Sequence, residues 1–200
     1  MKLHNKIATA LTLSASMLAA NTASAEFNRG EMLANTCVGC HGPMGISQGA
    51  APSIGGLSAT YFTDTMIAYR EGERPSTIMT RIAKGYSDED IEAMAAYFAA
   101  QKFSNSPYNT AGDAKMVSAG QKLHSKFCEK CHADNGTDPE DDAGFLKGQT
   151  HNYLTYSLED FMSGDREMDK KMAKKLKELH AKYGDKGIQA VVEFYADADK

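Results

Sequence analysis

The sequence of 200 residues lacks several features that would place it in other classes of protein. It has no tryptophan, only five prolines and no excess of basic residues, with 22 lysines and arginines against 26 acidic residues. The formal net charge of -4 excludes the strongly basic surface of a nucleic-acid-binding protein. A polytopic membrane protein is also excluded, because the longest apolar run, Ile7 to Ala20, has about 14 residues and a span needs about 20. The composition, 42% hydrophobic and 24% charged, is that of a soluble globular chain with one large or two small domains.

The N-terminus has the pattern of an export signal. Lys2 and Lys6 precede the apolar run, and Ala23-Ser24-Ala25 after it has the small-x-small form that signal peptidase cleaves. We therefore expect residues 1–25 to be a signal peptide, cleaved after Ala25, and the mature protein to be periplasmic. Loss of the two lysines leaves 20 basic against 26 acidic residues, a mildly acidic exported protein without a membrane span.

The four cysteines are more informative by their spacing than by their number. They form two C-x-x-C-H units, which begin at Cys37 and Cys128, and no cysteine is left over. This pattern is typical of covalent c-type haem attachment, because two thiols three positions apart can each add to one vinyl group of a porphyrin. A redox pair or half of a zinc site would fit one C-x-x-C, but the two motifs lie 91 residues apart, which is a domain spacing. The sequence thus predicts two covalently bound haems c, attached at Cys37, Cys40, Cys128 and Cys131, with His41 and His132 as proximal iron ligands.

The segments around the two motifs form an internal repeat. Gly30-Glu31-Met32-Leu33 corresponds to Gly120-Gln121-Lys122-Leu123, and the helical pattern of residues 91–99 corresponds to that of residues 188–196. A Gly-x-Arg follows an aromatic helical stretch in each half, at residues 72–74 and 164–166. Ser87 begins a capping box in the first copy, and Gly184 interrupts the pattern at the matching place in the second.

This repeat predicts an all-α fold of two tandem domains, residues 26–105 and residues 106–200, each wrapped around one haem. The join is expected between Gln101 and Lys115, where helical periodicity fails. Each copy has about 85 residues, which is too few to bury a large core without the cofactor.

The sixth iron ligand of the first half is predicted to be Met79. Pro75 is well placed to begin a helix that carries this methionine, because proline is favoured at the first helical position. Met44 and Met66 compete with Met79, since methionine also serves as ordinary core packing.

The second half offers two methionines four positions apart, Met168 and Met172, and the sequence alone does not separate them. Counting from the Gly-x-Arg arginine favours Met172, because Met79 is five positions on, Met172 six and Met168 two. Bis-histidine ligation also stays open, with spare histidines at positions 124, 151 and 180. A methionine ligand opposite the histidine would raise the reduction potential of the haem relative to bis-histidine ligation, which suits an electron acceptor.

Two charged segments accompany the second motif. Acidic residues follow it at positions 134, 138 and 140–142, and lysines occur at positions 170, 171, 174, 175 and 177. Both segments fit ordinary solvated surface, and either could instead steer a redox partner toward a haem edge.

Longer strings resemble a known family. Residues 76–87 (STIMTRIAKGYS), 122–132 (KLHSKFCEKCH) and 168–173 (MDKKMA) closely resemble the dihaem cytochrome subunit of flavocytochrome c sulfide dehydrogenase. This resemblance implies two class I cytochrome c domains related by a pseudo-twofold, in a periplasmic heterodimer with an FAD-binding subunit. In that family the flavin subunit oxidises sulfide, and electrons pass from flavin to haem and on to a soluble cytochrome or other acceptor.

The chain has no G-x-G-x-x-G dinucleotide fingerprint, so we expect FAD and the sulfide chemistry only on the partner subunit. By itself the chain would be non-catalytic and would have no catalytic residues. Pro52 is expected to supply the backbone carbonyl that orients His41, whereas no proline occupies the matching offset from His132.

Two other functions fit parts of the same pattern. A free-standing periplasmic dihaem carrier to a terminal oxidase would have the same fold and haems but no flavin partner. A dihaem peroxidase would need an open sixth position on one haem, and a methionine in each half argues against it.

Overall fold

The computed structural model describes residues 28–139 and 144–197, and the regular secondary structure of these residues is almost entirely helical. The predicted all-α class is confirmed, since the one named strand in the described ranges, β1 (Asp138–Pro139), has two residues. No helix within the described ranges is long and apolar enough to cross a membrane. The predicted signal peptide, residues 1–25, lies outside the described residues.

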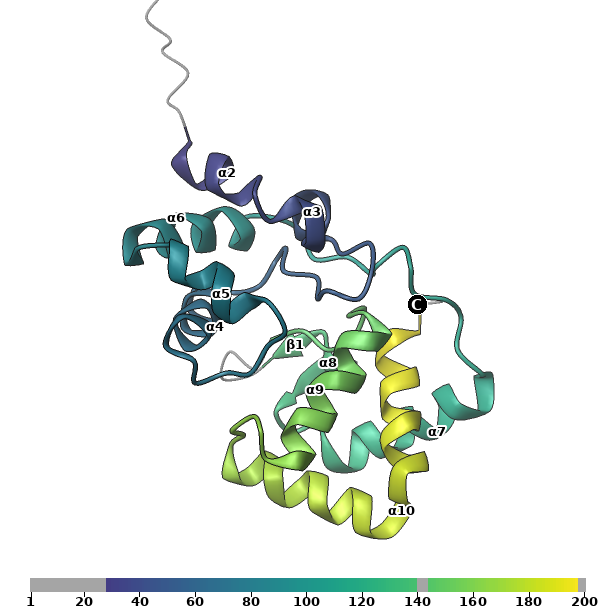
Figure 1. Ribbon diagram of the computed structural model, residues 1–200. Helices are drawn as coiled ribbons and strands as arrows, with labels where there is room; N and C mark the ends of the chain where they lie inside the picture. The colour runs from purple at the N-terminus through teal and green to yellow at the C-terminus, as the bar shows by residue number, and fades with distance from the viewer. Residues whose placement is uncertain (1–27, 140–143, 198–200) are drawn as a thin grey trace, which may run out of the picture.

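In the described ranges the first half is built mainly of short helices, and the second half of α7 to α10 (Figure 1). The first half comprises α2 (Arg29–Ala34), α3 (Val38–His41), η1 (Pro43–Gly45), α4 (Ala59–Glu71), α5 (Met79–Ile82), η2 (Ala83–Gly85) and α6 (Asp88–Ala99). The second half comprises α7 (Ala114–Phe127), α8 (Ala133–Gly136), α9 (His151–Ser163) and α10 (Lys170–Ala196), with β1 after α8.

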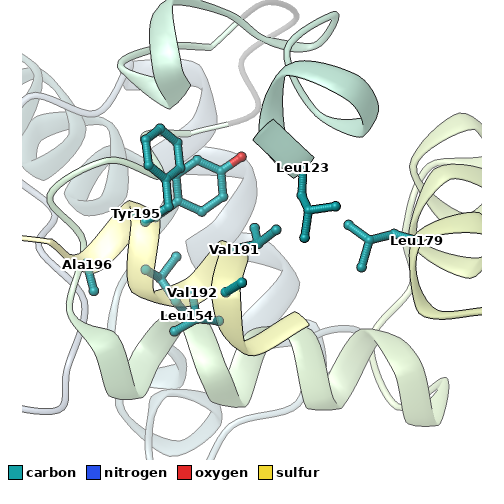
Figure 2. Close-up of a cluster of buried hydrophobic side chains, with 9 residues drawn as sticks. Leu123, Leu154, Leu179, Val191, Val192, Tyr195 and Ala196 are labelled. Carbon is teal, nitrogen blue, oxygen red and sulfur yellow. The ribbon is translucent and has the colours of Figure 1, made fainter. Parts of the chain in front are cut away.

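Each half has its own hydrophobic core. The first core is built around buried side chains of α4 and α6, among them Phe62, Ile91 and Phe98. The second lies among α7, α9 and α10, and Figure 2 shows its leucines and valines facing one another with Tyr195 above them. Residues 101–113 between the cores form neither helix nor strand. The predicted domain boundary at residues 105 and 106 falls in this segment and stays a prediction.

In each half a glycine lets the first helix pack against the last one. A Cβ on Gly30 of α2 would lie 2.3 Å from the Ala93 carbonyl oxygen of α6. A Cβ on Gly120 of α7 would lie 1.9 Å from the Ala190 carbonyl oxygen of α10. Any side chain at these positions would push the helices apart, so the repeat seen in the sequence corresponds to one packing contact made twice.

The middle helices repeat as well. Helix α4 is capped by Ser58 at its start and by Gly72 at its end, and α9 is capped by Thr150 and Gly164 in the same way, both glycines being left-handed. The arginine of each Gly-x-Arg then lies over an aromatic ring of the helix before it. The guanidinium of Arg74 is 5.0 Å from the Tyr69 ring centre, and that of Arg166 is 4.1 Å from the Phe161 ring centre.

Two local predictions about the helices have different outcomes. The capping box at Ser87 is confirmed, because its hydroxyl accepts from the Asp90 backbone and the Asp90 carboxylate accepts in return. The prediction that Pro75 begins a helix is wrong, since α5 begins at Met79. The hydroxyl of Ser76 accepts a 2.8 Å hydrogen bond from the Thr80 backbone N–H, and such a side-chain bond competes with helix formation before that point.

At Gly184 the helix continues beyond a kink. Helix α10 spans this position, but Gly184 has φ +60° and ψ -159°, which is not helical. The predicted interruption is therefore present as a kink that divides α10 into a lysine-rich first part and a buried second part. The second part corresponds to α6, because Ser87 and Gly184 precede equivalent helical turns 97 positions apart.

We predict that Gly30→Ala and Gly120→Ala each destabilise the haem-loaded protein by about 1–3 kcal/mol, because the added methyl group overpacks a helix crossing. Urea unfolding followed by circular dichroism would measure the change. Gly85→Ala is the matched control, since a Cβ there meets nothing within 4 Å and the residue has no positive φ. Equal stability of all three variants would contradict the close-crossing interpretation.

Candidate functional site

The first C-x-x-C-H motif forms a single helical turn. Helix α3 starts directly after Cys37, which is half-buried, and Cys40 is exposed on the same turn. The thiols of all four cysteines are free of disulfide bonds. One turn of helix places the two thiols of a motif near each other and puts His41 directly beside them.

His41 is oriented by the residue that the sequence analysis identified. Its ring is 8% exposed, and Nδ1 donates a 2.8 Å hydrogen bond to the backbone carbonyl of Pro52, which confirms that prediction. A carbonyl can only accept, so the ring proton sits on Nδ1 and Nε2 carries the lone pair. Burial lowers the pKa of His41 more than the Pro52 bond raises it, which favours the neutral ring that binds metal.

The second motif lacks this orienting bond. His132 is half-buried, and its Nδ1 atom is buried without a hydrogen-bond partner among the described residues. Burial, and then the nearby His124, lower the pKa of His132. Backbone N–H groups of the loop bond to the Gly45 carbonyl in the first half and to the Gly136 carbonyl in the second half. These equivalent bonds place Gly144 at the position of Pro52.

The candidate sixth ligands of the first half occupy different environments. Met79 is the first residue of α5 and packs half-buried against the first core. Its competitor Met66 is 6% exposed within that core, and Met44 is 54% exposed in η1. Met79 is therefore neither fully buried in the core, as Met66 is, nor mostly exposed, as Met44 is.

The second-half methionines are separated by the structural register of the repeat. Met172 lies in the first turn of α10, and Met168 lies in the loop before it. Gly72 and Gly164 are equivalent 92 positions apart, and Ser87 and Gly184 are equivalent 97 positions apart. Met79 lies between these two pairs of positions, so its counterpart lies 92 to 97 positions further on, between 171 and 176. This range includes Met172 and leaves out Met168.

The spare histidines have other partners. His151 and His180 are about half-exposed and lie 3.4 Å from Glu193 and 2.9 Å from Asp185. His124 is fully buried, with Nδ1 2.7 Å from the Tyr195 hydroxyl and Nε2 hydrogen-bonded to Glu129. Both nitrogens of His124 are thus engaged within the protein.

The sequence analysis missed this buried network of His124, Tyr195 and Glu129. The Tyr195 hydroxyl also contacts the Cys128 thiol, so the network reaches the second haem-attachment motif. A comparison of the two repeats could have indicated this network, because the positions of His124 and Tyr195 are occupied in the first half by Ala34 and Phe98, both apolar and buried. A histidine and a tyrosine that together replace an alanine and a phenylalanine indicate a polar pair.

Polar contacts join the two halves. The Gln149 side chain accepts from the Ser53 backbone N–H at 2.9 Å and donates to the Ser53 carbonyl at 2.7 Å. The Arg74 guanidinium, 8% exposed, donates to the Tyr153 hydroxyl at 2.8 Å and to the Thr65 hydroxyl at 3.1 Å. Burial raises the pKa of the Tyr153 phenol, but the positive charges of Arg74 and Arg166 outweigh this and lower it to about 8.

We predict that Tyr195→Phe destabilises the haem-loaded protein by about 1–3 kcal/mol, because it leaves the buried His124 Nδ1 without a partner. Urea unfolding monitored by absorbance and circular dichroism would measure this. Tyr183→Phe is the control, since Tyr183 is 39% exposed and its hydroxyl has no hydrogen bond within the described ranges. A change no larger than that of the control would show that the network contributes nothing to stability.

Comparisons with known proteins agree with the geometry of the first half. Residues 25–98 match the family model described as "Cytochrome C oxidase, cbb3-type, subunit III". The chain is 46% identical over 71 residues to the cytochrome subunit of sulfide dehydrogenase of Chlorobaculum tepidum, a match that covers 36% of this chain and 64% of that relative. It is also 46% identical over 79 residues to cytochrome c-554(548) of Halomonas halodenitrificans, which covers 36% of this chain and 93% of that relative.

A solved structure resembles both halves together. The crystal structure of reduced recombinant cytochrome c4 from Pseudomonas stutzeri superposes with a TM-score of 0.70 and 28% identity, covering 84% of this chain and 96% of that one. The likeness confirms the predicted fold of two class I cytochrome domains in tandem. With its C-x-x-C-H turns, its repeated helix pairs and these relatives, the chain belongs to the cytochrome c family.

Proposed function

We propose that this chain is a dihaem electron-transfer subunit that accepts electrons from an FAD-containing, sulfide-oxidising partner and passes them to a soluble acceptor. The observation that carries the proposal is the repeated C-x-x-C-H turn with free thiols and a half-buried or buried histidine. The 46% identity of one segment to a sulfide dehydrogenase cytochrome subunit supports the choice of electron donor.

The residues present fit two haems c, here called haem one and haem two after their motifs. Haem one would be attached at Cys37 and Cys40, and haem two at Cys128 and Cys131. The proximal histidines suit this use, because His41 presents an unprotonated Nε2 while Nδ1 is held by Pro52. Burial lowers the pKa of His132, which favours the neutral ring that binds metal.

The methionines would supply the sixth ligands. We assign Met79 to haem one and Met172 to haem two, the latter supported by the register of the repeat. When bound, a haem with histidine and methionine ligands exchanges one electron at a raised potential. Arg74 and Arg166 have no carboxylate partner among the described residues, so their positive charge would suit the propionates of the porphyrin.

Several contacts join the two halves at their junction. Paired Gln149–Ser53 hydrogen bonds and the buried Arg74–Tyr153 bond cross it, and Phe103 packs on Phe145 with ring centres 4.6 Å apart. These contacts would hold the two attachment sites near one separation, which would favour electron transfer within the chain. We infer export to the periplasm from the N-terminal signal pattern and FAD binding by the partner subunit from the resemblance.

A free-standing dihaem carrier is the second candidate. It is favoured by the extent of the cytochrome c4 likeness, which covers 84% of the chain, whereas the sulfide dehydrogenase match covers 36%. The two functions share fold and cofactors and differ in whether a flavin subunit is stably bound.

Purification of the protein from periplasm at mild salt tests the first function against the second. We expect a larger subunit with flavin absorbance to copurify, and micromolar sulfide to reduce the haems of the complex but not those of the isolated chain. A lone dihaem chain that is inert to sulfide and is reduced by a cytochrome-reducing membrane fraction would establish the carrier instead.

The ligand assignment predicts distinct effects of three substitutions. Met79→Ala and Met172→Ala should each remove half of the methionine-to-iron(III) absorption band in the far red and open one haem per chain to carbon monoxide. Met168→Ala is the control and should retain the full band, because Met168 lies outside the repeat register. Loss of the band in Met168→Ala, with Met172→Ala unchanged, would reverse the assignment.

A further inference from the structure

The surface beside the second C-x-x-C-H motif combines two aromatic rings with lysines. Phe127, the last residue of α7, meets Tyr183 of α10 edge to face, with ring centres 6.2 Å apart. Lys126 Nζ lies 5.2 Å from the centre of the Phe127 ring, and Lys182 Nζ lies 5.4 Å from the centre of the Tyr183 ring. The two ammonium groups therefore flank one aromatic pair next to Cys128.

Two further lysines extend this surface. Lys122 precedes Lys126 by one helical turn, and Lys130 lies between the two cysteines of the motif. All four side chains are exposed. We call Lys122, Lys126, Lys130 and Lys182, with Phe127 and Tyr183, the cationic face.

The lysines of the cationic face form no ion pair within the described part of the chain. None of its lysines has an acidic partner within ion-pair distance in residues 28–139 and 144–197. The nearest acidic side chains in the sequence are otherwise engaged, Glu129 with His124 and Asp185 with His180. A protein whose mature chain has six more acidic than basic residues thus presents a local excess of cations.

The first half provides an internal comparison. Thr36 and Tyr86 stand at the positions of Phe127 and Tyr183, and their hydroxyls are joined by a 2.8 Å hydrogen bond. The four lysines correspond there to Met32, Asn35, Gly39 and Gly85, none of which is charged. Since the fold needs no charge at these positions in the first half, the lysines of the second half are not explained by the fold.

We propose that the cationic face is the docking surface for an acidic one-electron acceptor protein, which takes its electron from haem two. The inference rests on the proposed function, because it requires a haem at Cys128 and Cys131. A haem held at Cys128 and Cys131 would supply one electron, its iron passing from ferrous to ferric, and the oxidised centre of the acceptor would be reduced by that electron. Exposed lysines steer an anionic partner and release it at moderate salt, while the aromatic pair supplies the apolar contact at the centre of the interface.

Stopped-flow oxidation of the reduced dihaem protein tests the proposal. The anionic oxidants are plastocyanin, an acidic blue-copper protein, and ferricyanide; the cationic one is tris(phenanthroline)cobalt(III). The test variant is Lys126→Glu with Lys182→Glu. The control is Lys102→Glu with Lys115→Glu, which changes net charge equally at two exposed lysines away from the face.

At low ionic strength we expect the test variant to slow oxidation of one haem by both anionic reagents about tenfold and to accelerate its oxidation by the cobalt complex. At about 0.5 M salt the difference should vanish, because the charges are screened. NMR titration with plastocyanin should show weaker binding of the test variant, and the control should resemble the wild type in both measurements.

Equal oxidation rates and equal plastocyanin binding for the test and control variants would overturn the proposal. It would also be overturned if the wild-type protein bound phosphatidylglycerol vesicles and the test variant did not. The vesicle result would assign the face to a membrane surface. A haem count by the pyridine haemochrome method separates these failures from failure of the proposed function, since a chain without haem two would lack half of the haem absorbance.

Discussion

The close approach of the first and last helices in each half is the contact on which the rest of the structure depends. Gly30 and Gly120 allow it, because their hydrogen atoms face backbone carbonyls of Ala93 and Ala190 where no side chain fits. Each crossing closes a chain of about 85 residues on itself. The C-x-x-C-H turn follows the first helix of each pair directly, so the same contact holds the candidate haem site against the core.

The two halves use one plan with different side chains, and the differences gather around the second motif. Ala34 and Phe98 of the first half correspond to His124 and Tyr195, which replace apolar packing by buried hydrogen bonds. The Thr36–Tyr86 hydrogen bond corresponds to the Phe127–Tyr183 ring contact. Such substitutions leave the helix crossing intact, so the surroundings of one site can change while the fold is retained.

The junction between the halves combines an aromatic contact, Phe103 on Phe145, with buried hydrogen bonds. Buried groups from both sides satisfy one another there, including the Arg74 guanidinium, the Tyr153 hydroxyl and the Gln149 amide. Buried polar groups that lose their partners are costly, so these bonds specify one relative position of the halves more sharply than apolar contact would. A fixed position suits a protein that passes electrons between two sites.

Local chemistry made several features predictable from the sequence alone. The two C-x-x-C-H units, the repeated glycines and the Ser87 capping box depend on residues that are neighbours in the chain, and so does the orientation of His41 through the nearby Pro52 carbonyl. Features that depend on distant residues could not be derived in this way. The burial of His124 follows from packing between segments, because its partner Tyr195 lies 71 positions away. The same holds for the cationic face, because Lys126 and Lys182 are 56 positions apart and only the contact of α7 with α10 brings them to one aromatic pair.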